Sequence, residues 1–128
     1  MKLLLDTCTF LWIAWDRPEL SGRARALFAD PANQVFLSAV SCWEMALKHG
    51  LGKLPLPDQP ERLVPRLRDL HGIEPLALDE EAALMLHRLP ALHRDPFDRM
   101  LVCQAIAAGL SILSPDPQLS AYPVRTEW

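Results

Sequence analysis

Short apolar runs alternate with helix-like segments along this 128-residue chain, and this alternation restricts its fold more than any other feature. The runs of strand length are 2–5, 34–37, 73–78, 111–113 and 124–128. The segments between them space apolar residues three and four positions apart, as amphipathic helices do. Such an alternation is typical of a parallel sheet with helices on both faces. We therefore predict one α/β domain over residues 1–128, with a central, mostly parallel sheet flanked by helices and the last strand at an edge.

Composition fits one soluble domain. Half of the residues are apolar, and a chain of this length should bury about two-thirds of the surface that its unfolded form exposes. No apolar run approaches the ~20 residues that span a bilayer, and Asp6 interrupts the apolar start of the chain, so we expect a cytoplasmic protein. The net charge of −3 gives no broad attraction for nucleic acid, and a site that handles phosphate would need local cations or a bound metal ion.

Cysteines and histidines do not predict a site for a soft metal. The three cysteines are Cys8, Cys42 and Cys103. They lie far apart without a C-x-x-C pair, so we interpret them as small core residues. His87 and His93 lack the i, i+4 spacing of helical zinc motifs, and we interpret both as surface or loop residues.

Two carboxylates follow predicted strands. Asp6 comes directly after the first apolar run and precedes a helix predicted over 10–15, for which Thr9 is the expected cap. Asp116 comes shortly after the fourth run, and a helix cap ahead of Pro117 is an equally good interpretation of it. Ligands of open parallel sheets collect beyond the carboxyl ends of the strands, where both acids would lie.

Two more carboxylates belong to the stretch 93–99, at the start of an apolar helix. Asp95 is the predicted N-cap, Pro96 the first helical residue and Asp98 an acid of the first turn, with Gly109 ending the helix. Their position near the positive end of the helix dipole predicts that both acids stay ionised. Ordinary capping and dipole compensation would explain them equally well.

Glu44 lies inside a helix predicted to run from Ser38 or Ser41 through His49. Its neighbours at helical spacing are apolar, so the carboxylate falls on or beside the buried face, where a charge needs a partner. A capping box, Ser41-x-x-Glu44, would supply that partner, whereas a cap at Ser38 would leave Glu44 free.

Together these acids predict a metal site. Parallel strands place Asp6 and Asp116 at one sheet edge, and the first turns of the helices bring Glu44, Asp95 and Asp98 toward it. No Lys or Arg is an obvious partner, so the carboxylates would repel each other unless a cation held them. Oxygen ligands select Mg²⁺ or Mn²⁺, which suit attack of water on a phosphodiester.

Four motifs in order carry a resemblance that spans nearly the whole chain. They are Leu3-Leu4-Leu5-Asp6-Thr7, Ser38-x-x-Ser41-x-Trp43-Glu44-x-Ala46-x-Lys48, Asp95-Pro96-Phe97-Asp98-Arg99 and Leu113-Ser114-Pro115-Asp116. The chain resembles the PIN domain, and within it the VapC-like toxins of bacterial toxin-antitoxin pairs.

The resemblance implies a PIN-like three-layer fold and a metal-dependent endoribonuclease that acts as a toxin on RNA. It implies an acidic cluster of Asp6, Glu44, Asp98 and Asp116, with Asp95 as an auxiliary acid and Mg²⁺ or Mn²⁺ as cofactor. The metal ligands expected among these acids are Asp6, Asp95, Asp98 and Asp116. This chain departs from the pattern where Ser114 and Pro115 stand in place of the Thr that relatives often carry before the last acid.

Partners of two kinds are expected. The candidate phosphate contacts flanking the motifs are Lys48, Lys53, Arg94, Arg99 and Ser114. For the cations, solvated helix ends are an equally good interpretation.

Trp12 and Trp15 belong to the predicted helix 10–15, which is apolar at nearly every position, so either it is buried on two sides or part of it meets another chain. The resemblance implies a homodimer and a cognate antitoxin.

There are three alternatives to this function. A phosphohydrolase of the haloacid dehalogenase class would need a second acid at the position of Cys8, and a phosphoacceptor receiver domain would need a late Lys, which is absent after Ala108. A non-catalytic protein-binding module would explain the helices and caps but would leave Glu44 without a purpose.

Overall fold

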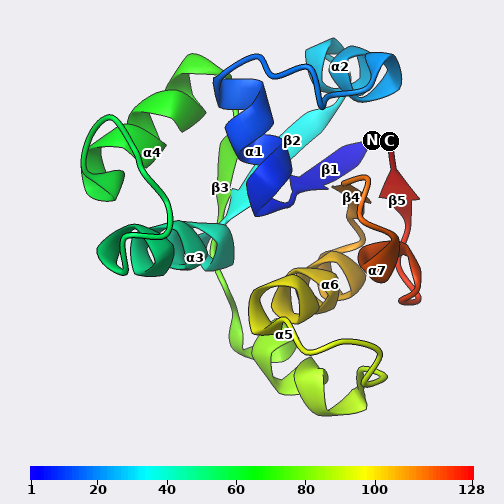
Figure 1. The fold of residues 1–128 in the computed structure, drawn as a ribbon. Coiled ribbons are helices and arrows are strands. Elements are labelled where there is room, and N and C mark those ends of the chain that lie inside the picture. The colour runs from blue at the N-terminus through cyan, green and yellow to red at the C-terminus, as the bar shows by residue number, and fades with distance from the viewer.

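The computed structural model describes residues 1–128 and confirms the predicted α/β architecture (Figure 1). Five strands form one sheet in the order β3-β2-β1-β4-β5, and every neighbouring pair is parallel. The strands are β1 (Lys2–Leu5), β2 (Gln34–Ser38), β3 (Glu74–Leu76), β4 (Ser111–Leu113) and β5 (Thr126–Glu127). The last strand lies at an edge, as predicted, and the sheet is wholly parallel.

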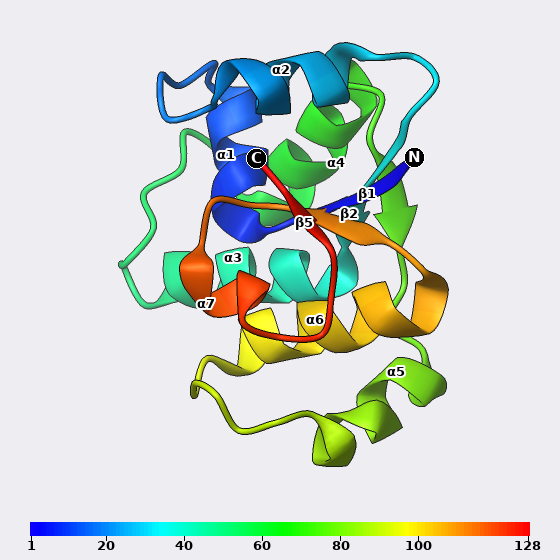
Figure 2. The same ribbon diagram turned by 90° about the vertical axis from the view of Figure 1, so that its right-hand side faces the viewer.

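Helices cover both faces of this sheet. They are α1 (Thr7–Ala14), α2 (Gly22–Ala29), α3 (Ala39–Gly50), α4 (Pro60–Leu70), α5 (Glu80–Met85), α6 (Pro96–Ala108) and α7 (Pro117–Ser120), with a 3₁₀ turn, η1 (Leu86–Arg88). Figure 2 shows α1, α2 and α4 on one side of the sheet and α5, α6 and α7 on the other. Helix α3 contacts α1, α4 and α6, and so links the two sides. None of the helices combines the length and apolar content that a membrane crossing needs.

The alternation of side chains along β1 explains why helices are needed on both faces. Leu3 and Leu5 belong to an apolar cluster with residues of α1, α2 and α4, whereas Leu4 belongs to a second cluster with residues of α6 and α7. All three leucines are fully buried. A strand with both faces buried reads as a continuous apolar run, which is how residues 3–5 appear in the sequence.

Helix starts were predicted with mixed success. Asp95 caps α6 and Gly109, with φ of 68°, ends it, as predicted. Thr9 was wrong as the cap of the first helix, because the Asp6 side chain accepts the Thr9 backbone N–H at 2.8 Å and starts α1 at Thr7. Of the two serines considered for α3, Ser38 is the cap, and its Oγ accepts the Val40 N–H at 2.9 Å.

Candidate active site

Strand pairing places Asp6 beside Ser114. Leu5 and Leu113, the last residues of β1 and β4, are register partners, so the residues that follow them leave the sheet together. The Ser114 hydroxyl donates to Asp6 Oδ2 at 2.5 Å and accepts the Asp116 backbone N–H at 3.1 Å. Asp6 is only 7% exposed. Burial raises the pKa of its carboxyl, and the hydrogen bonds from Ser114 and Thr9 oppose that rise.

The start of α6 contributes Asp95 and Asp98. Asp95 Oδ1 accepts the backbone N–H groups of Phe97 at 2.9 Å and Asp98 at 3.1 Å. This oxygen therefore caps α6. The Asp98 side chain is 20% exposed. Burial first, and then the charges of Asp95, Asp6 and Glu44, raise the pKa of Asp98 to about 6. The sequence predicted that the helix dipole would keep the pKa of Asp98 low. The pKa is raised instead, because desolvation and like charges outweigh the dipole.

Glu44 is 6% exposed and has two partners. The Thr7 hydroxyl donates to its Oε1 at 2.6 Å, and the Lys48 ammonium pairs with its Oε2 one helical turn away. Of the two interpretations considered, the capping box with Ser41 is wrong and the cap at Ser38 is confirmed, so the Glu44 side chain is not used in capping. The expectation that no Lys or Arg accompanies the acids is also wrong for Glu44. The i, i+4 spacing of Glu44 and Lys48 was a usable signal in the sequence.

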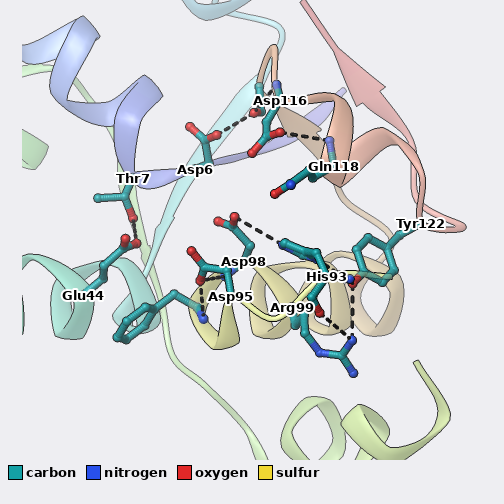
Figure 3. A network of polar contacts seen from close by, with 12 residues as sticks. Asp6, Thr7, Glu44, His93, Asp95, Asp98, Arg99, Asp116, Gln118 and Tyr122 are labelled. Carbon is teal, nitrogen blue, oxygen red and sulfur yellow. Dashed lines mark hydrogen bonds and ion pairs between the residues drawn. The ribbon is translucent and has the colours of Figure 1, made fainter. Parts of the chain in front are cut away.

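Asp116 begins α7. Its Oδ1 accepts the Gln118 backbone N–H at 2.9 Å, which is the capping role considered for it. Figure 3 shows the side chains of Asp6, Asp95, Asp98 and Asp116 gathered between β1, α6 and α7, with Glu44 to one side against Thr7. The fold thus brings the five acids of four separate motifs to the carboxyl edge of the sheet.

The cations considered as phosphate contacts differ in exposure and in the partners of their side chains. Arg94 and Lys53 are exposed. Lys48 is engaged with Glu44, which raises the pKa of its ammonium. Arg99 turns toward the preceding loop and donates Nη1 to the carbonyls of Pro90 at 3.0 Å and His93 at 3.3 Å. Binding of RNA by these cations stays a prediction.

His93 and Tyr122 adjoin the acidic cluster, and sequence reasoning did not predict this. His93 lies in a loop, as predicted, but its side chain is 9% exposed rather than on the surface. Its Nε2 lies 3.5 Å from Asp98 Oδ2, and its Nδ1 lies 2.6 Å from the hydroxyl of Tyr122. These two residues are 29 positions apart in the chain, so no local pattern could have paired them.

The acidic donors suit a hard cation. As the side chains stand, no three His, Cys, Asp or Glu groups are placed to hold one ion. The donors nevertheless are all carboxylate oxygens. Burial and then the like charges around Asp98 raise its pKa, and a divalent cation would relieve the repulsion between those charges. Residues Asp6, Asp95, Asp98 and Asp116 therefore fit an Mg²⁺ or Mn²⁺ ion by their chemistry.

A family model described as the PIN domain matches residues 3–124. The chain belongs to the PIN-domain family. The recognition made from the four motifs is thereby confirmed. Ribonuclease VapC16 of Mycobacterium tuberculosis is 42% identical to this PIN domain over 55 residues, which are 43% of this chain and 39% of that protein. The match thus spans about two-fifths of the length of that relative.

Solved structures share the fold of this PIN domain over nearly its whole length. VapBC2 from Rickettsia felis, bound to a DNA fragment from its promoter, matches with a TM-score of 0.73 and 15% identity over 99% of this chain and 98% of that one. DNA-bound VapBC from Salmonella typhimurium matches with a TM-score of 0.69 and 21% identity over 99% and 97%. FitAcB from Neisseria gonorrhoeae matches with a TM-score of 0.62 and 22% identity over 97% and 95%.

Proposed function

We propose that this PIN domain is a metal-dependent endoribonuclease that hydrolyses RNA phosphodiester bonds and acts as the toxin of a toxin-antitoxin pair. One observation carries the proposal. Asp6 and Asp98, both largely buried, lie with Glu44, Asp95 and Asp116 at the carboxyl edge of the sheet, and burial together with the charges of Asp95, Asp6 and Glu44 raises the pKa of Asp98. Burying so many acids costs free energy, and binding a cation would offset that cost.

We propose separate roles for the acids and for the hydroxyl groups that contact them. Asp6, Asp98, Asp95 and Asp116 are proposed to hold Mg²⁺ or Mn²⁺, and Glu44 to complete the catalytic cluster. When bound, such an ion lowers the pKa of water and neutralises charge on a phosphate. Ser114 orients Asp6 through its 2.5 Å hydrogen bond, and Thr7 orients Glu44 in the same way at 2.6 Å. Hydroxyl donors of this kind fix carboxylates without adding a competing charge.

Substrate binding is proposed for Arg94 and Lys48, with Arg99 and Ser114 nearby. The net charge of −3 means that attraction for RNA must be local, and the exposed Arg94 adjoins Asp95 at the site. The pairing of Lys48 with Glu44 supports the proposal that Lys48 contacts a phosphate at this site.

Protein partners follow from what the similar structures contain. The structures from Rickettsia felis and Salmonella typhimurium are VapBC assemblies bound to DNA, and we propose a cognate antitoxin and a homodimer for this chain. Trp12 packs edge to face on Trp128, with ring centroids 5.8 Å apart, so the chain itself covers part of α1. Trp15 is 43% exposed. An antitoxin arginine pairing with the acids would satisfy them in place of the cation.

The alternatives are less well supported. A binding module has no need for five acids at one sheet edge, although Glu44 is now explained by Thr7 and Lys48. A phosphohydrolase of the haloacid dehalogenase class would use a second acid where Cys8 stands. Cys8 is exposed, so the core position predicted for it is wrong. Partial burial of the thiol and the charges of Asp6 and Glu44 raise its pKa, which makes it a poor nucleophile.

The test is cleavage of RNA by the purified chain with Mg²⁺ or Mn²⁺ and with EDTA. Asp98→Asn and Asp6→Asn keep the side-chain shape while removing one ligand charge each, and cleavage should fall at least ~100-fold. Asp69→Asn, at an exposed position near the end of α4, is the matched control and should cut like the parent. Folded Asp98→Asn and Asp6→Asn proteins that cut at the parental rate, or cutting that survives EDTA, would refute the proposal.

A further inference from the structure

The hydroxyl of Tyr122 has three polar neighbours that fix where its proton goes. Tyr122 is 3% exposed. Its oxygen accepts the His93 backbone N–H at 3.2 Å and the Arg99 Nη1 at 3.3 Å, and it lies 2.6 Å from His93 Nδ1. A phenol oxygen accepts two hydrogen bonds and donates one. Since two N–H groups already point at this oxygen, a third donation to it from His93 Nδ1 is disfavoured, and donation of the Tyr122 O–H to His93 Nδ1 is the arrangement that satisfies all three contacts.

This donation determines the tautomer of His93. A neutral imidazole carries one N–H, and a ring nitrogen that accepts a hydrogen bond is the one without the proton. The His93 proton therefore lies on Nε2. That atom is buried, has no hydrogen-bond partner within bonding geometry, and lies 3.5 Å from Asp98 Oδ2 (Figure 3). A buried donor without a partner is rare in a folded protein and here faces one acceptor.

We propose that His93, held as the Nε2–H tautomer by Tyr122, is a positioning residue that orients the Asp98 carboxylate, a proposed ligand of the cation, through Oδ2. This inference rests on the proposed function. Catalytic hydrogen bonds are often long in structures without substrate, and the 3.5 Å separation between His93 Nε2 and Asp98 Oδ2 fits that pattern. Residues that orient metal ligands in this way tune the affinity for the ion.

Arg99 holds the loop that carries His93 and contacts the Tyr122 hydroxyl. Its Nη1 also donates to the carbonyl oxygens of Pro90 and His93, so one guanidinium fixes both the loop backbone and the Tyr122 hydroxyl. Burial first, and then the charges of Asp95, Asp6 and Glu44, raise the pKa of Asp98, and the His93 Nε2–H that faces Oδ2 from 3.5 Å opposes that rise. A neutral donor on the loop side thus stabilises the ionised Asp98 carboxylate that a cation requires.

The tautomer is measured directly on the metal-free parent chain labelled with ¹⁵N-histidine. At about pH 8, where an ordinary histidine is neutral, the shifts of the two ring nitrogens of His93 should report the proton on Nε2. Tyr122→Phe keeps the buried ring and removes the hydroxyl, so the preference for Nε2–H should weaken. A parent chain with the proton on Nδ1, or Tyr122→Phe shifts identical to those of the parent, would overturn the inference.

The positioning role is tested by Mn²⁺ affinity in calorimetric titrations. His93→Ala should weaken Mn²⁺ binding by about 10- to 100-fold, and His93→Gln, whose amide N–H can replace Nε2–H, should recover part of it. His87→Ala is the control, because His87 is exposed and near the carbonyl of Leu84 rather than an acid. Parental Mn²⁺ affinity in His93→Ala overturns the role while leaving the nuclease assignment standing. Absence of RNA cleavage by the parent would instead refute the proposed function, and the affinities would still decide the role of His93.

Discussion

Ser114 donates its hydroxyl to Asp6 Oδ2 at 2.5 Å, between two residues that are 108 positions apart and follow neighbouring parallel strands. The bond joins the first and last acidic motifs of the chain. The same Ser114 oxygen accepts the Asp116 backbone N–H, so the turn that leads into α7 is tied to the acid that caps α1. One hydroxyl thus links the position of Asp6 to the path of the chain before Asp116.

Removing this hydroxyl should destabilise the fold and impair the site. Ser114→Ala leaves a buried carboxylate short of one donor, at a cost of about 1.5–3 kcal/mol for a hydrogen bond to a charged group. Ser114→Thr keeps the hydroxyl and is the matched control. Urea denaturation should show a lower midpoint for Ser114→Ala and a near-parental one for Ser114→Thr, and equal midpoints for all three proteins would contradict the assigned bond.

The pKa of Asp98 predicts a pH-dependent difference in stability. A carboxyl whose pKa is raised from 3.8 to about 6 on folding binds its proton more tightly in the folded state. Its contribution is therefore fully favourable below about pH 4 and is lost as the pH rises through 6. Asp98→Asn cannot ionise, so it should gain stability relative to the parent between those limits, by up to about 3 kcal/mol for a shift of this size.

The comparison is made by chemical denaturation in EDTA at both ends of this pH range. Subtracting the parent from Asp98→Asn removes the contributions of the other titrating groups. Adding Mn²⁺ at neutral pH should stabilise the parent and not the variant, since only the parent has the full set of ligands. A difference in unfolding free energy that is constant with pH would show that Asp98 titrates as an exposed acid does.

Arg94 and Lys48 should contribute to RNA binding through phosphates. Measured in an Asp98→Asn background, Arg94→Ala or Lys48→Ala should weaken binding and reduce the slope of log affinity against log salt by about 1 each. Arg125→Ala is the control, because the exposed Arg125 precedes β5 and so lies toward the opposite, amino-terminal edge of the sheet. A salt slope unchanged by the first two substitutions would place both cations outside the RNA-binding surface.

Expression of the chain alone should arrest bacterial growth if it is a toxin. The Asp98→Asn form should be harmless, and co-expression with the small neighbouring reading frame should restore growth. Colony counts after induction, with immunoblots showing equal protein levels, measure the effect. Harmless expression of a parent chain that cuts RNA in vitro would refute the toxin role but not the nuclease activity.

Helix starts and strands that depend on interactions between neighbouring residues could be predicted from the sequence. The cap and first turn of α6 follow from Asp95-Pro96 because an N-cap and a proline at the first helical position act within three residues. The strands follow from apolar runs, and the convergence of Asp6 and Asp116 follows from parallel pairing, which sends the carboxyl ends of all strands to one edge.

Tertiary structure decided which partner each polar side chain takes. Thr7 donates to Glu44 across 37 residues, and the Tyr122 hydroxyl pairs with His93 Nδ1 across 29. Such pairs cannot be predicted from the sequence, because they depend on how the helices pack on the sheet. The pKa of Asp98 was likewise beyond the sequence, since the helix dipole acts locally while burial and the charges of distant acids act only once the chain has folded.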